Sequence, residues 1–558
     1  PVAGGRYHPT MESRAAAHVL AEIAVLRQLR GEDDATTAAC LAAARRLAQG
    51  GRAPLPADAT DADPVVAGVL AELVATGESL VLDALREATP EGLQELEEAV
   101  RDGRVAALPR FGPRTADRVR KAIAQLRESG APVLLPHADA EAARLARAIE
   151  GLAGVASVTV AGRLRRRHET ITALRLVVGC DGHPGDVAAA VAALRGVATA
   201  HGVATRTVTL HFADATTAHV HCVPAAQATL AAWRATGSTG HVAAVTARLA
   251  DRGLAIVGDE LRDAQGAPIA LASEHTLYSI AGLAWIAPEL RESAGEIAAA
   301  ADGTLPALLE TTQLRGALHC HTSWSDGSAT VAELAEAALA RGWAYVGVSD
   351  HSRSALNAGG LSADDVRRQH EEIDAVNARL AGRVRVLKGI EADILPCGRV
   401  DYDAAVLDRF DYVIASVHTR FGMNATQMTD RVCKALEDPH VTILGHPTGR
   451  LLLTREPFAI DMPTVLAQAA ARGVAVELNA DPHRLDLDWR WCRAAREAGA
   501  LVALGPDAHS LAGLDNVRLG TDIARKGWLA ARDVLNTRPL DELLAFARRR
   551  RDAALAAA

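Results

Sequence analysis

Imidazole and carboxylate side chains recur at short spacing in the second half of the chain, and together they suit zinc, manganese or iron. The stretch "LRGALHCHTSWSDGS" (314–328) holds the first of them. The complete set of nine is His319, His321, Asp326, His351, Glu391, His418, His446, Asp507 and His509. One ion needs fewer ligands than nine, so we expect two or three divalent ions, with Glu391 central enough to bridge a pair.

Regular alternation of apolar strands and helices after residue 312 predicts how these residues are positioned. Seven apolar stretches are "RGALHCH", "AYVGVSDH", "VRVLKGIE", "DYVIASVH", "VTILGHP", "VAVELNA" and "LVALGPDAH". Helical stretches such as "TVAELAEAALARG" separate most of them, which predicts a parallel sheet closed into a β/α barrel. The active site of such a barrel lies at the carboxyl ends of its strands, so these residues should converge at one mouth.

Not every histidine fits this pattern. Nine histidines follow residue 311, and six of them stand at predicted strand ends. We interpret the other three, His370, His440 and His483, as surface or satisfied core residues. Cys320 alternates to the opposite face of its strand and is predicted to be packed and not ligated.

The rest of the 558-residue chain predicts several domains. Residues 1–80 and 81–130 read as helical, 131–225 as α/β, 226–311 as mixed helix and turn with a linker, and 312–558 as the barrel. Seven cysteines without a C-x-x-C pair favour a reducing cytoplasm, and neither a signal peptide nor a membrane span is apparent. The net charge of −8 provides no global attraction to nucleic acid.

Several motifs in the barrel carry a resemblance to a known family. "LHCHTSWSDG", "SDH", "GIEADIL", "SVH", "LGHPTGRLLL", "ELNADPHRLDL" and "DAHS" resemble the PHP (polymerase and histidinol phosphatase) domain, in the version fused to bacterial family X DNA polymerases. The resemblance implies a distorted seven-stranded barrel with a trinuclear metal centre. It assigns His319, His321, Glu391 and Asp507 to one ion. It assigns Glu391, His418 and His446 to a second ion, and Asp326, His351 and His509 to a third.

Four residues are our candidates for catalytic roles: Glu391, Asp507, Asp350 and Arg450. We expect Asp350 to orient a ligand histidine through a hydrogen bond. Arg450, in "GHPTGR", and Arg353 are candidates for binding the substrate phosphate, although exposed arginines without such a role are equally common.

The front half resembles the rest of a family X polymerase in its order: a helical lyase-like domain, a helix-hairpin-helix segment "LPRFGPRTADRV", a palm and a thumb-like region. The palm motif should contain two aspartates, yet "AGRLRRRHETITALR" (161–175) has Ala173 and Arg175 in their places. The third expected aspartate falls on His219. Nucleotidyl transfer needs carboxylates to hold two magnesium ions, so this predicts an inactive polymerase module.

Further losses in the front half point the same way. Arg163 replaces a serine expected to bind triphosphate, and Arg234 and Ala235 replace an aromatic pair. Expected phosphate-binding positions are Ala35, Thr36, Ala38 and Cys40, and Arg110 replaces a hairpin glycine. No lysine precedes residue 121, so the Schiff-base nucleophile of a lyase is missing. The run Arg163, Arg165, Arg166 and Arg167 could still bind a phosphate backbone or be a solvated face.

These observations predict a metal-dependent phosphoesterase, with zinc, manganese or iron as cofactor. By resemblance its substrate is DNA, cleaved from the 3′ end or at abasic sites. Two alternatives stay open: a small-molecule phosphomonoesterase of the histidinol phosphatase kind, and a non-catalytic DNA-repair scaffold. The predicted partners are DNA or a small phosphate ester and no membrane, with the oligomeric state left open.

Overall fold

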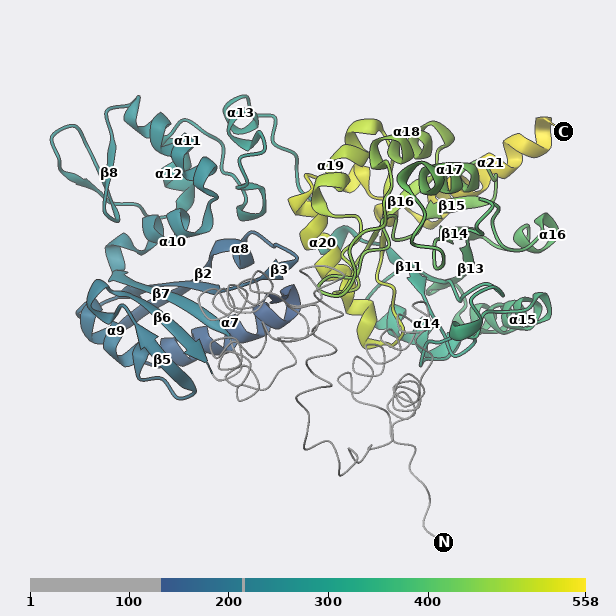
Figure 1. Cartoon of the computed structure of the whole chain (residues 1–558), viewed down its shortest axis with the longest axis horizontal. Coiled ribbons are helices and arrows are strands. Elements are labelled where there is room, and N and C mark those ends of the chain that lie inside the picture. Colours follow the sequence, from purple (N-terminus) through teal and green to yellow (C-terminus); the bar gives the residue numbers. More distant parts are fainter. Residues whose placement is uncertain (1–131, 213–215, 558) are drawn as a thin grey trace, which may run out of the picture. The chain divides into compact units, whose positions relative to one another are not determined.

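The computed structural model describes residues 132–212 and 216–557 (Figure 1). The chain divides into two compact units, Pro1–Gln125 and Leu126–Ala558, and all described residues lie in the second. The predicted helical domain (1–80) and the helix-hairpin-helix segment (81–130), with their altered residues, lie outside the described ranges. Among the described residues, no helix is both long and apolar enough to cross a bilayer.

Residues 133–224 form a five-stranded sheet in the order β2-β4-β7-β6-β5, as the β-rich runs predict. Its strands are β2 (Val155–Ala161), β4 (Leu174–Cys180), β5 (Val197–His201), β6 (Thr207–Phe212) and β7 (Thr217–Pro224). Only β4 and β7 pair in parallel. A separate antiparallel pair joins β1 (Val133–Leu134) to β3 (Thr170–Ile171).

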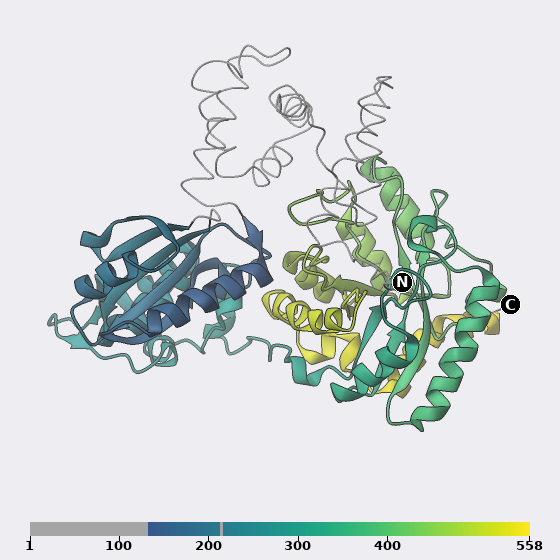
Figure 2. The same cartoon turned by 90° about the horizontal axis from the view of Figure 1, so that it is seen from below.

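One face of this sheet buries a core against α7 (Leu135–Glu150) and α9 (Pro184–Ala192), which Figure 2 shows beside the strands. The buried residues of α7 recur at three-to-four spacing, as on the inner stripe of a helix. Alternate residues of β4 provide the sheet side of the core, for example Leu174, Leu176 and Val178. On the opposite face a smaller buried cluster joins Ala161, Val177 and Val223 to Ala231 and Ala232 of α10 (Ala228–Thr236). Between β2 and β3 lies the short helix α8 (Gly162–Arg165), and η2 (Val203–Thr205) precedes β6.

Residues 225–313 are helical with one small sheet that the sequence did not predict. The helices are η3 (Ala225–Gln227), α10 (Ala228–Thr236), α11 (Thr239–Ala250), α12 (Glu274–Ile280), η4 (Pro288–Leu290), α13 (Glu296–Ala301) and η5 (Thr311–Gln313). The antiparallel sheet joins β8 (Ala255–Val257), β9 (Glu260–Arg262) and β10 (Pro268–Ile269). Strands of two or three residues are too short to show a two-residue period, which explains why their residues carry no readable signal.

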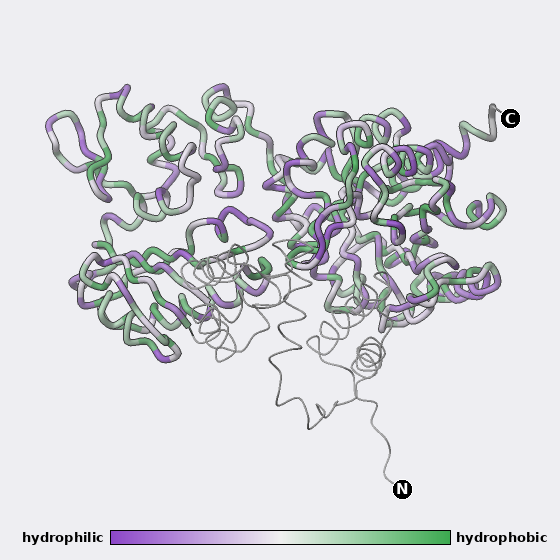
Figure 3. The backbone as a smooth tube through the Cα atoms, viewed as in Figure 1, coloured by the Kyte–Doolittle hydropathy of each residue, from purple (hydrophilic) through white to green (hydrophobic). Residues whose placement is uncertain are grey.

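The seven predicted barrel strands are all present and all parallel, in sequence order from β11 to β17. They are β11 (Gly316–Cys320), β12 (Tyr345–Val348), β13 (Arg385–Asp393), β14 (Tyr412–Ser416), β15 (Val441–Leu444), β16 (Ala475–Asn479) and β17 (Val502–Gly505). A parallel bridge between Cys320 and Ala508 brings the first strand to the last, so the barrel is nearly closed. In Figure 3 apolar stretches follow these strands and polar ones lie on the surrounding helices.

Helices follow most of the strands and cover the outside of the barrel. They are α14 (Val331–Ala340), η6 (Leu356–Ala358), α15 (Ala363–Leu380), α16 (Ala404–Leu407), α17 (Ala425–Ala435), α18 (Met462–Arg472), α19 (Trp489–Ala498), η7 (Ala512–Asn516), α20 (Val517–Lys526), η8 (Ala531–Asp533), η9 (Leu535–Thr537) and α21 (Leu540–Ala557). Capping boxes at Thr330, Ser362 and Asn424 satisfy the first amides of α14, α15 and α17.

The inside of the barrel is filled at the amino ends of the strands. Leu318, Tyr345, Leu387 and Tyr412 belong to a buried cluster there that also contains residues of η9 and α21. A second, larger cluster lies between the strands and the outer helices and contains Cys320, which is packed as predicted. Because apolar side chains fill the amino end, the polar strand-end residues are left to line the carboxyl end.

Candidate metal centre

All nine predicted ligands lie at or just beyond the carboxyl ends of barrel strands, and the structure brings them together. Their ligand atoms form four groups, and within each group the atoms lie within 4.8 Å of one another. The groups are His321, Asp326, His351 and His509; His319, His321 and Asp507; His319, Glu391 and His446; and His351, Glu391 and His418. Shared members link the groups into one continuous cluster.

Glu391, only 1% exposed, occupies the middle of this cluster. Its Oε1 lies 2.8 Å from Nε2 of His446 and 3.2 Å from Nε2 of His418. Its Oε2 lies 3.1 Å from Nδ1 of His351 and 3.4 Å from Nε2 of His319. Oε2 also lies 3.7 Å from Nε2 of His321. A carboxylate with imidazoles facing both of its oxygens would be shared between ions.

Several imidazole nitrogens of the cluster are buried without a hydrogen-bond partner among the described residues. They are His319 Nε2, both ring nitrogens of His321, His351 Nδ1 and His446 Nδ1. A buried polar atom left unsatisfied costs about 1–3 kcal/mol, so five in one place need an explanation. A divalent cation would satisfy one nitrogen of each ring, because a neutral imidazole has a single lone-pair nitrogen, which is a preferred ligand of zinc, manganese and iron. The donor set therefore fits a metal cluster.

Two carboxylates that the sequence analysis missed orient the ligand histidines. Glu477 Oε1 lies 2.5 Å from Nδ1 of His319, and Asp393 Oδ1 lies 2.5 Å from Nδ1 of His418. Each contact leaves the Nε2 atom of that ring facing the cluster, which is the usual arrangement behind a metal-bound histidine. The signal was present in "GIEAD" and "ELNAD", where alternation along the strand turns Asp393 and Glu477 toward the inside of the barrel.

Close packing around Glu477 requires a glycine on the next strand. A Cβ built on Gly505 would overlap the carboxylate of Glu477 and crowd His319. Backbone conformation is also unusual at two cluster residues, since His319 has φ of +69° and Asp507 has φ of +49°. Left-handed conformations at non-glycine residues cost about 1–3 kcal/mol and gather at functional sites. The surrounding structure therefore holds His319 and Asp507 in a strained backbone conformation that directs their side chains into the cluster.

Asp507 is held from the side opposite the histidines. Asn479 donates from Nδ2 to Oδ2 of Asp507 at 2.9 Å, and Nε of Arg484 lies 3.2 Å from the same oxygen. The other oxygen, Oδ1, lies 3.2 Å from His321 Nε2 and 3.5 Å from His319 Nε2. The contacts to Asn479 and Arg484 thus point Oδ1 into the cluster.

Paired charges control protonation in the cluster. Burial lowers the pKa of His418, but the Glu391 and Asp393 carboxylates outweigh it and raise that pKa to about 10. Burial is likewise outweighed at His509, where Asp326 contributes to raising the pKa to about 9. A metal ion displaces the proton from an imidazole that it binds, so we expect the cluster to bind cations more tightly as pH rises.

The same contacts lower the pKa values of the carboxylates in the cluster. Burial raises the pKa of Glu391, but His418 and His319 outweigh it and hold that pKa well below its ordinary value. The pKa of Asp507 is also lowered, mainly because His319 outweighs burial there. Burial lowers the pKa of His446 to about 3, so this ring is neutral near pH 7 and ready to act as a ligand.

Asp350 has a different role from the one predicted. Its carboxylate accepts hydrogen bonds from the amide and hydroxyl of Thr322, at 2.8 and 2.6 Å, and from Ser325 and Gln369. No hydrogen bond to a histidine is present among the described residues. Asp350 instead anchors the loop that carries His321 and Asp326, and it is completely buried. Because the loop leaves β11 directly, its Thr322 amide has no strand partner within the described part of the chain and donates to Asp350 instead.

Arg450 is also placed differently from the prediction. Its Nε donates to the Arg484 carbonyl oxygen at 2.9 Å, and its Nη2 donates to the Leu485 carbonyl oxygen and to Oε1 of Glu169. Nη1 lies 3.6 Å from Asp488, and the residue is 8% exposed. Because Nε and Nη2 are engaged by protein acceptors and the residue is almost completely buried, Arg450 is not presented to a substrate phosphate.

Residues assigned to ordinary contacts show such contacts. His440 lies between Asp438 and Asp408, His483 lies beside Asp481, and His370 packs edge-on against Phe410. Arg353 pairs with Asp401 at 3.1 Å and its side chain is largely exposed. It therefore remains a candidate for contact with substrate phosphate.

The five-stranded sheet offers no comparable constellation. Arg175 on β4 and His219 on β7 are register partners, so a guanidinium and an imidazole lie side by side where carboxylates were expected. His211, His219 and His221 each contact a threonine hydroxyl on the neighbouring strand, as ordinary strand residues do. Within residues 132–212 and 216–557, all four groups of potential metal ligands lie in the barrel.

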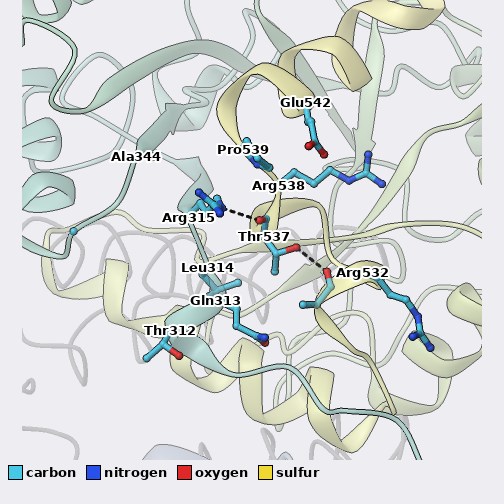
Figure 4. A pocket seen from close by; sticks show the side chains of 12 residues that line it. Thr312, Gln313, Leu314, Arg315, Ala344, Arg532, Thr537, Arg538, Pro539 and Glu542 are labelled. Atoms are coloured by element: carbon cyan, nitrogen blue, oxygen red, sulfur yellow. Dashed lines mark hydrogen bonds between the residues drawn. The ribbon is translucent and has the colours of Figure 1, made fainter.

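A cavity of about 720 Å³ lies at the other end of the barrel (Figure 4). It is lined by residues that precede β11 and β12 and by residues of η8, η9 and α21, including Arg315, Arg532 and Arg538. Arg315 donates from Nε to the Thr537 carbonyl oxygen at 3.2 Å. None of the nine cluster residues lines this cavity. The predicted metal chemistry belongs to the carboxyl end alone.

Comparisons with known proteins match both halves of the chain. The PHP domain matches residues 317–480, and the DNA polymerase beta thumb matches residues 231–292. "DNA polymerase/3'-5' exonuclease PolX" of Bacillus subtilis is 32% identical over 568 residues, which cover 95% of this chain and 98% of that protein. A "Probable phosphatase" of Syntrophotalea carbinolica is 28% identical over 245 residues, covering 41% of this chain and 94% of that protein.

Among solved structures, a histidinol phosphate phosphatase of Lactococcus lactis in complex with zinc, L-histidinol and phosphate is 15% identical. It covers 38% of this chain and 93% of its own, with a TM-score of 0.29. A likeness at that level supports no conclusion about the chemistry of this chain.

Proposed function

The chain belongs to the bacterial family X DNA polymerases with a C-terminal PHP domain, and on that premise we propose that its barrel is a metal-dependent phosphoesterase. The proposed substrate is DNA, degraded from its 3′ end. The relative from Bacillus subtilis, which aligns over nearly the whole chain, is named as a polymerase and a 3′–5′ exonuclease. The polymerase half of that description requires carboxylates that Ala173, Arg175 and His219 do not supply.

One observation carries the proposal: buried imidazole nitrogens without partners surround a buried carboxylate at a barrel mouth. We propose that the nine cluster residues hold two or three ions of zinc, manganese or iron, with Glu391 shared between them. When bound, such ions provide an activated water and neutralise charge on the phosphate. Asp507 and Glu391 would keep that water and the ions in place, and the Glu477 and Asp393 carboxylates would hold the His319 and His418 rings in the ligating orientation.

A small phosphate monoester is the second candidate substrate. It is favoured by the relative named as a probable phosphatase, which the barrel covers over 94% of its length. The lost DNA-binding positions in the front half also favour it. A scaffold with structural metals fits less well, because structural zinc sites are closed by four ligands and do not form a linked cluster of nine.

The test compares two substrates on one metal-free preparation. Purified full-length protein is stripped with chelator and reloaded with Mn²⁺. Nucleotide release from an oligonucleotide labelled at its 3′ end is then measured beside phosphate release from histidinol phosphate. Activity on the oligonucleotide supports the nuclease, and activity on the monoester alone supports the phosphatase. Bound metal without either activity would overturn the proposal and favour the scaffold.

A further inference from the structure

The arginine run of the former polymerase motif is engaged in contacts within the protein. In the loop 162–169, Arg165 pairs with Glu274 at 2.6 Å, Arg166 with Glu292 at 2.8 Å, and Arg167 with Asp139 at 2.7 Å. These guanidinium groups are therefore already neutralised by carboxylates. Arg163 alone of the run is exposed, so the three paired arginines have their role within the protein.

Three side-chain contacts join this loop to the barrel region. Arg167 lies 3.4 Å from Asp522 of α20, and the two other contacts are more deeply buried. At the end of α20, Lys526 is completely buried and donates from Nζ to the Arg166 carbonyl oxygen at 3.0 Å, while it pairs with Glu292 at 2.5 Å. At the end of the loop, Glu169 Oε1 accepts from Nη2 of Arg450 at 3.3 Å. Since a buried charge without a partner is costly, both contacts resist separation of the loop from the barrel.

The contact of Glu169 differs in kind because it continues toward the metal cluster. Glu169 is the carboxylate closest to Arg450. Asp488 lies at 3.6 Å and is shared with Arg490. Burial raises the pKa of Asp486, and Arg450 counteracts that rise. Removal of the Glu169 charge would take the closest of these counter-charges from a buried guanidinium. Arg450 in turn binds the carbonyl oxygens of Arg484 and Leu485.

The turn that Arg450 contacts contains a residue with a strained backbone conformation. It also carries a side chain that contacts one of the nine cluster residues. Leu485 has φ of +41°, which a residue other than glycine adopts only when its surroundings hold it there. The preceding side chain, Arg484, reaches Oδ2 of the candidate ligand Asp507 at 3.2 Å. The contacts thus run from Glu169 through Arg450 and the turn at 484–485 to Asp507.

We infer that Glu169 is a positioning residue of the metal centre, acting through Arg450 on the turn that orients Arg484 and Asp507. The loop, which belongs to the motif whose polymerase ligands are lost, thereby keeps a function as a support for the hydrolase site. The inference rests on the proposed metal centre. It explains why this segment would be retained in a chain whose nucleotidyl-transfer positions are occupied by Ala173, Arg175 and His219.

The test uses the full-length chain with Glu169→Gln, which keeps the shape and removes the charge. The matched control is Glu274→Gln, which weakens the ion pairs of Glu274 with Arg165 of the same loop and with the buried Arg291, without touching the barrel. Mn²⁺ affinity is measured by titration of the metal-free proteins. We expect Glu169→Gln to bind Mn²⁺ about 3- to 30-fold more weakly than wild type, the range usual for coupling through a packed network, and Glu274→Gln to bind as wild type.

Hydrogen exchange of the metal-free proteins supplies a readout that needs neither metal nor activity. Amides of residues 479–488 should exchange faster in Glu169→Gln than in wild type or Glu274→Gln. A double-mutant cycle with Arg450→Lys should show strong non-additivity, because both changes interrupt the same contact path. Should Glu169→Gln fail to fold, Arg450→Lys alone is compared with Glu274→Gln in both measurements.

The outcomes separate this inference from the proposed function. Unchanged Mn²⁺ affinity and unchanged exchange in Glu169→Gln would overturn the inference, as would equal effects of Glu169→Gln and Glu274→Gln, which indicate general loosening. Wild-type protein that binds no Mn²⁺ would refute the proposed metal centre. In that case faster exchange at 479–488 in Glu169→Gln would still support the contact path.

Discussion

The five-stranded sheet and the barrel both have strand positions at which their families hold metal ions. The two regions differ in which side chains occupy those positions. In the barrel nine imidazoles and carboxylates converge. In the sheet the corresponding family positions hold Ala173, Arg175 and His219. The sheet has nevertheless kept its buried core of Leu176, Val178 and Val220. Packing and catalysis are therefore separable, since a core requires only apolar volume whereas a metal site requires particular donor atoms.

The largest contrast concerns primer extension. We expect no nucleotide incorporation by purified protein with Mg²⁺ or Mn²⁺, because an alanine provides no ligand and a guanidinium repels the cation. Extension of a labelled primer on a gapped template is the measurement, with a family X polymerase that retains its three aspartates as the positive control. Extension that persists after further purification would mean that the sheet keeps a working site.

Removal of the central carboxylate should abolish hydrolysis. Glu391→Gln is expected to lower metal-dependent phosphoester cleavage by at least about 1,000-fold and to reduce the bound metal, because five imidazoles face this group. Cleavage rate and metal content are measured on the same preparation. His219→Ala, in the sheet, is the matched control and should cleave as wild type. Comparable losses in both variants would remove the distinction between the two regions.

A smaller effect on metal binding is expected from a residue that contacts a candidate ligand without being one. Glu477→Gln should weaken Mn²⁺ binding by about 10- to 100-fold, because His319 loses the charged acceptor that fixes its ring. Binding is measured by titration, and the free energy of unfolding of the metal-free protein is measured beside it. Wild-type Mn²⁺ affinity in this variant would show that the contact between Glu477 and His319 does not contribute to metal binding.

The smallest expected effect concerns stability where the two regions meet. Burial raises the pKa of Asp522 to about 6, although Arg167 lies 3.4 Å away. The folded state then binds the proton more tightly than the unfolded state, so this carboxyl costs stability progressively between about pH 4 and pH 6 and fully above it. Asp522→Asn should therefore raise the free energy of unfolding by about 1–3 kcal/mol at pH 7.5.

The pH dependence provides the check on that prediction. Denaturant unfolding at pH 7.5 and pH 4.5 should show the larger gain at pH 7.5, because at pH 4.5 the wild-type carboxyl is already largely protonated when folded. A gain that is equal at both pH values, or larger at pH 4.5, would contradict the assignment. Arg167 keeps Asp139 as a partner in the variant, so loss of that arginine's pairing should not obscure the effect.

Much of the barrel was determined by sequence alone. Apolar stretches of seven to nine residues, most of them separated by helices, predicted all seven strands. Their carboxyl ends then predicted which side chains meet, because parallel strands end at a common edge. The three short strands between residues 255 and 269 carry no such signal, since their periods are too short to read.

Only the tertiary structure decided which partners those side chains meet across the fold. Periodicity places Glu477 on an inner face but does not say that His319, 158 positions earlier, lies against it. It likewise cannot tell that Arg450 faces two carbonyl oxygens and Glu169 instead of a phosphate. Hydrogen bonds between distant segments depend on how helices and loops pack around the strands, and residue type and spacing along the chain do not encode that packing.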